Sequence, residues 1–570
     1  MAGPVHYEVF IRKTPPSPWT LLMATEERQV AIDSAEETLR ELRAAAVRVT
    51  KETLDPRTME FSSTTLLTKG APEVQRKQKA VEEHTGPRCN QPGDLYAPQA
   101  RELISRVLDD WLVRQNITAF ELLHRPDLAE KLDASGVELQ HAIQKVAVPE
   151  SQASGRPVHD LMRHYQKLAD QAVERVIGAG RRKMFPTLAE RSLGEIANTL
   201  MGTPDRAFIM GGVISGALTG LRGGRARLDR LMDLADQAPT GGAPQAQVMV
   251  VIEQIACELL AVRANLADVL GPALDQGASL AAVVRMIAPR EVEALIAHDP
   301  KIDLQVPALE GPAARLAERL QRGELPLLVS VLSRMVLREL MSPRRLRPRD
   351  PAGEIDILRI LATTLTATGG RLLTLEEIQA GFTERSKNIV TADFVTAYVA
   401  ECETVMGEAE RLTRLCVNVT GPGNKRSAGR WLAACVTSLR FEMEQRQATI
   451  PTAQRLAVLA GLQREVRGAG LPEPELEQVT VAIGKVGGAI EADARIVAQI
   501  GRATASPQQK LNVLLRLAAG ESAPLGPVSE RARAEVMRLM RAPETRAALA
   551  AAPETLAPIK GLMQAAGLAA

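Results

Sequence analysis

The chain has 570 residues, of which 45% are hydrophobic and only 3% are aromatic. Lys and Arg total 70 against 68 Asp and Glu, so the net charge of +2 excludes a general attraction to polyanions. The scarcity of aromatic side chains argues against stacking platforms for single-stranded nucleic acid. Five cysteines, an odd number without a C-x-x-C pair, indicate a reducing compartment.

The N-terminal sequence predicts neither a signal peptide nor a membrane anchor. Residues 1–13 lack an apolar segment, and no uninterrupted apolar run reaches the roughly 18 residues that a spanning helix needs. We therefore expect a cytoplasmic protein with no membrane span. The preference for Ala and Arg over Lys and aromatic residues is typical of GC-rich bacterial coding sequences.

Residues 1–70 predict a small α+β module with the element order ββαββ. An amphipathic helix after Thr25, which we expect to be its N-cap, separates two pairs of β-prone runs. These runs lie at residues 6–11, 19–23, 45–54 and 61–68. The helix should cover one face of the sheet. Because the module carries no catalytic set of residues, we interpret it as a binding or assembly unit.

A polar, charged stretch with Gly and Pro follows, and we predict a linker over residues 71–95. It contains Cys89, the one cysteine that we expect to be exposed. No second cysteine lies near it in the sequence, which favours an incidental thiol over metal or redox chemistry.

We predict a first helical domain over residues 96–341, organised around one long helix from Pro244 to Leu270. Proline suits a first helical turn, and Gly271-Pro272 ends the helix. Apolar residues recur in steps of three and four, at Val248, Ile252, Ile255, Leu259, Val262, Leu266 and Val269. A continuous helix of this length would be a rod of roughly 40 Å.

Four glycines spaced four apart precede this helix, at Gly212, Gly216, Gly220 and Gly224. In one helix they would form a stripe of small residues, at a cost of roughly 1 kcal/mol per Gly relative to Ala. The favoured interpretation is that a second helix packs closely along the stripe. A flexible segment and a ligand lying on bare backbone are the alternatives.

Residues 342–352 are rich in Pro and Arg and predict the boundary between two helical domains. Prolines disfavour a helix here, so the arginines should project from an extended linker. These arginines are Arg344, Arg345, Arg347 and Arg349. The alternative is a contact with an anion, a nucleic acid or an acidic partner.

The second helical domain is predicted over residues 353–570. A Gly-Pro-Gly turn leads into Asn424, Lys425 and Arg426, with Asn424 as the expected N-cap of a helix over residues 425–447. A helix N-terminus beside two cations could also bind an anion. The segment is not a P-loop, because the G-x-x-x-x-G-K-[ST] motif is absent.

Three windows share one pattern: a basic residue, leucines one, four and seven positions later, and a proline seventeen positions later. They begin at Arg227, Arg455 and Lys510. We interpret each window as an αα-hairpin, with two repeats at residues 455–503 and 510–560. The predicted fold is therefore mainly α, a small α+β module followed by αα-hairpins with repeat character. An irregular all-α bundle is the alternative.

The sequence contains no recognisable catalytic, cofactor-binding or metal-binding motif. Repeated hairpins without such motifs favour a non-enzymatic scaffold or regulatory protein that binds protein partners or a second copy of itself. The alternative is a nucleic-acid-binding regulator that uses Arg344 to Arg349. An enzyme whose site is assembled only in three dimensions is the third hypothesis.

Overall fold

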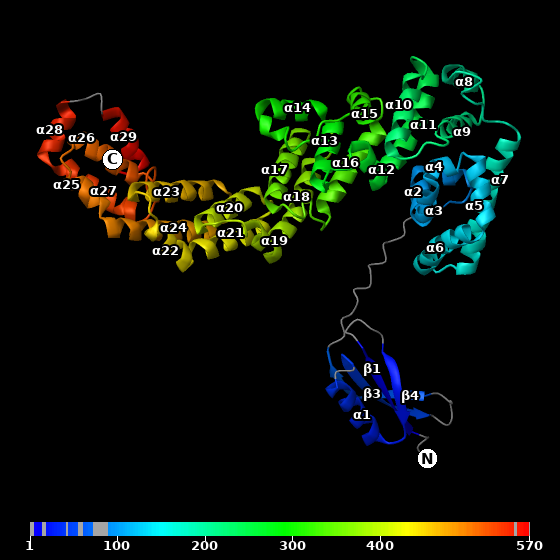
Figure 1. Ribbon diagram of the computed structural model, residues 1–570, viewed down its shortest axis with the longest axis horizontal. Coiled ribbons are helices and arrows are strands. Elements are labelled where there is room, and N and C mark those ends of the chain that lie inside the picture. Colours follow the sequence, from blue (N-terminus) through cyan, green and yellow to red (C-terminus); the bar gives the residue numbers. More distant parts are fainter. Residues whose placement is uncertain are drawn as a thin grey trace. The chain divides into compact units, whose positions relative to one another are not determined.

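The computed structural model describes residues 5–13, 19–41, 44–54, 61–71, 89–551 and 556–568. Within these ranges the predicted fold class is confirmed. A four-stranded antiparallel sheet near the N-terminus is followed by a large helical region (Figure 1). Two compact units divide the chain: Met1–Arg88 with Ile143–Tyr165, and Cys89–Ala142 with Gln166–Ala570.

The sheet has the strand order β2-β1-β3-β4, and every neighbouring pair is antiparallel. The elements are β1 (Val5–Arg12), β2 (Thr20–Thr25), α1 (Arg28–Arg40), β3 (Ala46–Leu54) and β4 (Phe61–Gly70). Ala31 and Ala35 of α1 pack with Val9, Val47 and Val49 in one buried cluster. Small alanines on the inner face of α1 allow a helix to lie close to the sheet, which confirms the ββαββ module.

Thr25 is not the N-cap of α1, contrary to the prediction. The N-cap is Glu27, whose backbone N–H donates to Thr25 Oγ1 at 3.2 Å. The Thr25 hydroxyl thus orders the turn before the helix, and α1 begins at Arg28.

The predicted linker over residues 71–95 lies mostly outside the described residues, which resume at Cys89. Cys89 is only 5% exposed, so the expectation of an exposed thiol is wrong. A short 3₁₀-helix, η1 (Pro92–Tyr96), follows it directly.

Helices fill the rest of the chain. Up to Met341 they are α2 (Pro98–Val107), α3 (Asp109–Gln115), α4 (Ala119–Leu122), α5 (Pro126–Ser135), α6 (Val137–Ser154), α7 (Val158–Arg181), α8 (Leu193–Leu200), α9 (Arg206–Ala217), α10 (Gly224–Asp236), α11 (Gly242–Ala261), α12 (Arg263–Leu270), α13 (Gln276–Ile287), α14 (Pro289–His298), the 3₁₀-helix η2 (Pro300–Ile302), α15 (Pro312–Gln321) and α16 (Pro326–Met341).

The helix predicted over residues 425–447 is two helices in the structure. Helices also form most of the described chain beyond Met341. They are α17 (Pro351–Ala367), α18 (Leu375–Ile389), α19 (Ala392–Val399), α20 (Val405–Asn418), α21 (Pro422–Val436), α22 (Leu439–Gln447), α23 (Thr452–Gly468), α24 (Glu473–Ala494), α25 (Ile496–Arg502), α26 (Pro507–Ala518), α27 (Pro527–Arg541), α28 (Pro543–Ala551) and α29 (Leu556–Ala565).

The predicted rod from Pro244 to Leu270 is two helices, α11 and α12, bent by 98°. Val262 adopts an extended conformation at the break and is 37% exposed. The Asn265 side chain donates to the Leu259 carbonyl at 3.2 Å, which satisfies an acceptor that the break leaves free. Apolar spacing alone could not reveal this bend, because the stripe continues on both sides of Val262.

The three predicted hairpins are confirmed as packed helix pairs, α10 with α11, α23 with α24 and α26 with α27. Each of their nine pattern leucines is at most 4% exposed, at Leu228, Leu231, Leu234, Leu456, Leu459, Leu462, Leu511, Leu514 and Leu517. The leucines therefore form the interior that holds each pair together.

The basic residue that opens each hairpin also has a structural role. Arg455 donates to the Arg446 carbonyl at 2.7 Å, and Lys510 donates to the Gly501 carbonyl at 3.3 Å. Both carbonyls lie at the C-terminal end of the preceding helix, where positive charge is stabilising. Arg227 differs, because it forms a buried ion pair with Glu121.

In the part of the chain that the structure describes, no single helix is long and apolar enough to cross a bilayer. The bent pair of α11 and α12 meets the length and composition criteria only when the two helices are taken together.

Candidate functional site

A cleft of about 630 Å³ lies within the second unit, between α11 and the segments that carry η1, α4, α7 and the start of α9. Its lining includes Tyr96, Phe120, His124, Arg175, Phe208 and Val250. This volume is in the range of small-molecule sites, roughly 300–1,000 Å³. The cleft is therefore a candidate ligand site among the residues that the structure describes.

Aromatic side chains form one wall of the cleft. Phe120 and His124 are stacked, with ring centroids 4.1 Å apart. Tyr96 meets His124 edge-on at 5.2 Å and Phe208 edge-on at 5.8 Å. The chain has only 15 aromatic residues of the Phe, Tyr and Trp types, so three of them at one cleft are a marked concentration.

His124 supports this wall and is not an acid–base group at neutral pH. Its Nδ1 lies 2.7 Å from the Phe120 carbonyl oxygen. Burial lowers the pKa of His124 to about 4, so its imidazole is neutral. Gly211 of α9 lies so close that a Cβ there would be 2.4 Å from the ring. Backbone and ring therefore pack directly.

Two arginines lie over the aromatic rings. The Arg175 guanidinium is 4.4 Å from the Phe208 centroid and 5.2 Å from that of Tyr96, and it pairs with Asp205 at 3.0 Å. Arg101 lies 5.0 Å from the Phe120 centroid and pairs with Glu258 at 2.6 Å. Such cation–π contacts fix the orientation of a guanidinium.

Two buried polar atoms at the cleft have no hydrogen-bond partner among the described residues: Tyr96 Oη and Gln247 Oε1. Burial raises the pKa of Tyr96 to about 12, so its hydroxyl keeps the proton and can donate. Buried polar atoms without a hydrogen-bond partner lower the stability of the folded chain. At a cleft they are groups to which a ligand or water can bind.

The predicted arginine segment before α17 is packed against its neighbours and is not an extended spacer. Leu346 is fully buried, and its carbonyl accepts from the Gly277 N–H at 3.1 Å. Arg345 lies 4.6 Å from the Phe394 ring, and Arg347 pairs with Asp275 at 3.2 Å. Of the four predicted contact residues, only Arg344 and Arg349 are exposed. Separate helical domains on either side stay a prediction.

The predicted anion site at the start of α21 is not assembled. Asn424 lies inside the first turn of α21, with Gly421 as the N-cap, and donates to the Thr383 carbonyl at 2.9 Å. Lys425 donates to the Cys416 carbonyl at 2.5 Å and to the Ala469 carbonyl at 2.7 Å. Its burial lowers the pKa of Lys425. Only Arg426 is exposed.

The four predicted glycines do not share one helix, because α9 ends at Ala217. Gly220 lies in a turn with a φ of +81°, and neither it nor Gly216 has a close neighbour. Close packing does occur at the other two. A Cβ on Gly212 would meet the Phe185 ring at 2.1 Å, and one on Gly224 would meet the Asn265 carbonyl oxygen at 2.3 Å. Of the four glycines, Gly224 thus packs tightly against another helix, α12, whereas Gly212 packs against an aromatic ring outside the helices.

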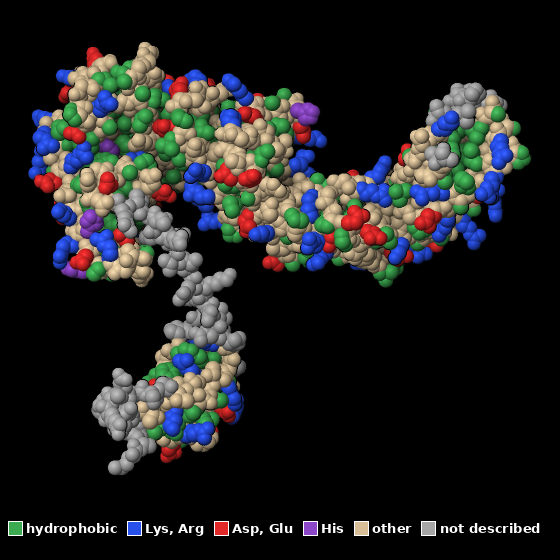
Figure 2. Space-filling view, turned by 180° about the vertical axis from the view of Figure 1, so that it is seen from behind, with side chains coloured by type: hydrophobic (Ala, Val, Ile, Leu, Met, Phe, Trp, Pro, Cys, Tyr) green, Lys and Arg blue, Asp and Glu red, His purple; other side chains and the backbone are tan. Residues whose placement is uncertain are grey.

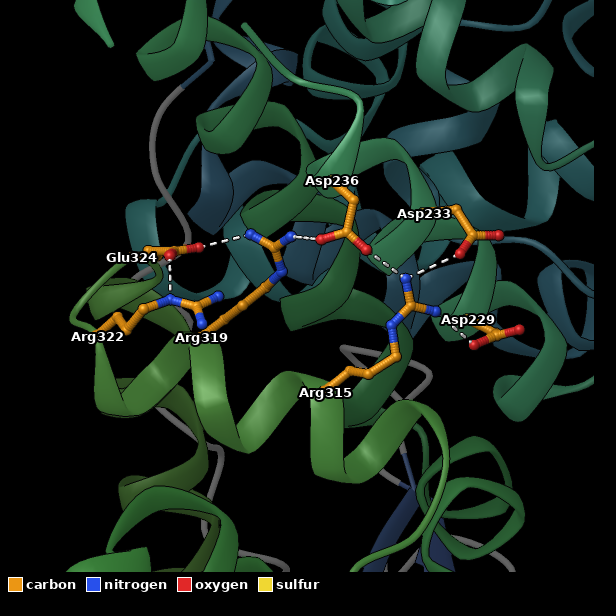
Figure 3. Close-up of polar contacts among 7 residues, drawn as sticks. All are labelled: Asp229, Asp233, Asp236, Arg315, Arg319, Arg322 and Glu324. Atoms are coloured by element: carbon orange, nitrogen blue, oxygen red, sulfur yellow. Dashed lines mark hydrogen bonds and ion pairs between the residues drawn. The ribbon is translucent and has the colours of Figure 1, made fainter. Parts of the chain in front are cut away.

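An ion-pair network joins α10 to α15 (Figure 3). Arg315 contacts Asp229, Asp233 and Asp236 at 2.7–2.8 Å. Arg319 contacts Asp236 as well as Glu324. The arginines hold the pKa of Asp236 below its ordinary value. Since every carboxylate of the network contacts at least one arginine, we interpret this network as a structural link between the two helices.

An exposed apolar face lies on α22, which packs against α24 of the first C-terminal hairpin. Leu439 is 69% exposed and Met443, one turn later, is 46% exposed; Ile450 in the following turn is 40% exposed. The single helix predicted over residues 425–447 would not have separated Leu439 from the buried residues before it, and the structure breaks that helix just before Leu439. Ser438 caps the helix, which places Leu439 at its first residue on the surface.

The same region carries an excess of positive charge. Residues 420–551 contain eighteen Lys and Arg against twelve Asp and Glu, whereas the whole chain has a net charge of only +2. Blue side chains accordingly gather along the C-terminal helices in Figure 2.

Among the described residues no group of three or more His, Cys, Asp or Glu side chains could hold a metal ion. Comparisons with protein-family models, with curated proteins and with solved structures give no match to this chain. The site must therefore be interpreted from its own geometry.

Sequence reasoning missed both the cleft and the α22 face. The cleft residues are scattered from Tyr96 to Gln254, so no local motif marks them. The clustering of Tyr96, Phe120 and Phe208 within about a fifth of an aromatic-poor chain was an available signal. Leu439 was missed because a Ser-capped helix start resembles the interior of a longer apolar helix.

Proposed function

We propose that this chain is a non-enzymatic scaffold or regulatory protein that binds a partner protein through its C-terminal helical hairpins. The single observation that carries the proposal is the exposure of Leu439 and Met443 on α22, with Ile450 exposed shortly after the helix ends. Exposed apolar residues grouped on one helix face favour a protein contact.

The chemistry of the surroundings indicates what kind of partner fits. Leu439 and Met443 are four residues apart and so lie on one side of α22. Arg440, between them in the sequence, is 75% exposed and pairs with Glu408 at 3.4 Å, and residues 420–551 have an excess of six positive charges. We therefore propose an acidic, amphipathic helix of a partner protein, bound with its apolar face on α22.

The nucleic-acid alternative has weaker support. Arg345 and Arg347 are already engaged by Phe394 and Asp275, which leaves two of the four arginines for phosphate contacts. A mobility shift that disappears in an R344Q/R349Q variant would favour this alternative over the protein partner.

The test is quantitative affinity purification with the full chain, comparing the wild type with an L439E/M443E variant. The matched control is L375E, because Leu375 is also the first residue of a Ser/Thr-capped helix and is 59% exposed. We expect a specific partner to be lost with L439E/M443E and retained with L375E. Leu439 and Leu375 lie in first helical turns, where an acidic residue is favourable, and Met443 is 46% exposed, so both variants should fold.

A partner set that L439E/M443E leaves unchanged would overturn the proposal. If the partner is a second copy of the chain, light scattering will show an oligomer that the same double variant dissociates. Binding that strengthens with increasing salt would contradict the acidic character of the partner.

A further inference from the structure

The aromatic cleft has a chemistry distinct from that of the hairpin surface. Its lining combines flat rings with small or aliphatic residues of α11, namely Ala243, Ala246, Val250 and Val251. Val250 is 50% exposed at the mouth, whereas Val251 is 4% exposed inside. A slot between rings and aliphatic side chains fits a flat apolar body.

The charges of the lining residues favour an anion. The lining contains Arg101, Arg175 and Arg206 but only one carboxylate, Asp205. Glu258, outside the lining, pairs with Arg101. Arg175 and Arg206 therefore face one carboxylate between them.

Arg175 is the best placed of these cations. Its side chain is 36% exposed, and its partner Asp205 is 54% exposed, so this pair is largely solvated and weak. The rings of Phe208 and Tyr96 hold the guanidinium in place, with little freedom left to lose when a ligand binds. A planar guanidinium binds a carboxylate with two parallel hydrogen bonds.

The unpaired atoms Tyr96 Oη and Gln247 Oε1 complete the set, one able to donate and the other able only to accept. Both belong to residues that line the cleft. A polar ligand group that reached them would supply the hydrogen bonds that these two buried atoms lack.

We propose that this cleft is a binding site for a small aromatic carboxylate, whose ring lies between Phe208 and α11 and whose carboxylate pairs with Arg175. The site is independent of the α22 face and does not require the proposed partner. Of the two lining residues that could act as an acid, a base or a metal ligand, His124 is buried and neutral and Asp205 pairs with Arg175, which favours binding without turnover.

The experiment is isothermal titration calorimetry of the full chain with three probes. These are 2-naphthoate, its neutral analogue 2-naphthamide, and cyclohexanecarboxylate, which has the charge but no flat ring. We expect 2-naphthoate to bind about tenfold more tightly than either analogue, the scale of one charge-assisted hydrogen-bonded contact.

Two variants locate the binding. R175Q should bring the affinity for 2-naphthoate down to that for 2-naphthamide, and R175K should restore part of the difference. A246W fills the cleft from an exposed position on α11 and should abolish binding. The matched control is A453W, at an exposed alanine of α23 outside the cleft, which should bind as the wild type does.

Absence of detectable heat with 2-naphthoate at millimolar concentration would overturn the proposal. Equal affinity for the acid and the amide would also overturn it, as would unchanged binding in A246W. Urea midpoints for each variant separate a lost site from a lost fold.

Discussion

At the scale of single residues, we expect substitutions to be most destabilising where they break a buried ion pair. Glu121 and Arg227 are both 1% exposed in side-chain terms and pair directly. Glu121 also accepts from the Thr118 N–H at 2.8 Å, which completes a capping box at the start of α4. The Glu121 carboxylate thus connects the start of α4 to the Arg227 guanidinium, 106 positions away in the sequence.

We expect E121Q to lower the free energy of unfolding by about 3 kcal/mol, because it leaves a buried guanidinium without a counter-charge. Urea unfolding followed by circular dichroism measures this change. E293Q, which breaks the more exposed pair of Arg285 and Glu293, is the control and should have a smaller effect. In E121Q, addition of R227M should recover part of the loss; no recovery would argue against the charge as the cause.

His124 makes stability dependent on pH. Burial lowers the pKa of His124 in the folded chain to about 4, against 6.5 for an ordinary histidine. Between these values only the unfolded chain takes up the proton, so stability decreases as pH falls from 6.5 to 4. The loss over the whole window is about 3 kcal/mol.

Unfolding free energies measured from pH 7 to pH 4 test this contribution. The slope should become shallower in H124N, which does not titrate in this window, and should remain that of the wild type in H298N, at an exposed histidine. Equal slopes in the wild type and H124N would show that His124 is protonated without penalty.

At the scale of helices and their connections, close backbone contacts determine how the hairpins pack. Gly484 of α24 lies against the connector between α26 and α27, where a Cβ would be 2.5 Å from the Leu525 carbonyl oxygen. Gln463 of α23 ties down the same connector, since it both donates to the Leu525 carbonyl and accepts from its N–H. Successive hairpins are therefore joined through backbone contacts as well as leucines.

Two alanine substitutions at helical glycines should have opposite signs. G484A should destabilise by about 2 kcal/mol, because the rigid backbone of the connector must move. G461A should stabilise by up to about 1 kcal/mol, since Gly461 lies within α23 with open space where a Cβ would point. Thermal unfolding of both variants measures the two changes in stability. If both variants were stabilised or both destabilised, the packing described at Gly484 and Gly461 would be contradicted.

The residue patterns predicted which helices and strands form more accurately than they predicted where each element begins and ends. Buried leucines and a later proline located the hairpins, because a periodic apolar stripe must face a partner helix. The break at Val262 and the start of α22 at Leu439 were not foreseeable, since both depend on neighbours far away in the sequence. The glycine series failed for the same reason. Gly212 and Gly224 are tightly packed, but against Phe185 and Asn265, which lie in two different segments.

At the scale of the whole molecule, charge is distributed unevenly. The nearly neutral chain concentrates its positive excess in residues 420–551, which also carry the exposed face of α22. The cleft lies apart in the sequence, with lining residues between Gly93 and Gln254. Neither surface could be assigned from a local motif, because each is assembled from side chains whose neighbours only the fold defines.

Hydrogen–deuterium exchange of the full chain, with and without the partner recovered by affinity purification, tests the proposed docking face most directly. We expect the partner to slow exchange across residues 438–451, which span α22 and the turn that contains Ile450. Protection elsewhere, with the exchange of residues 438–451 unchanged, would contradict binding through this face.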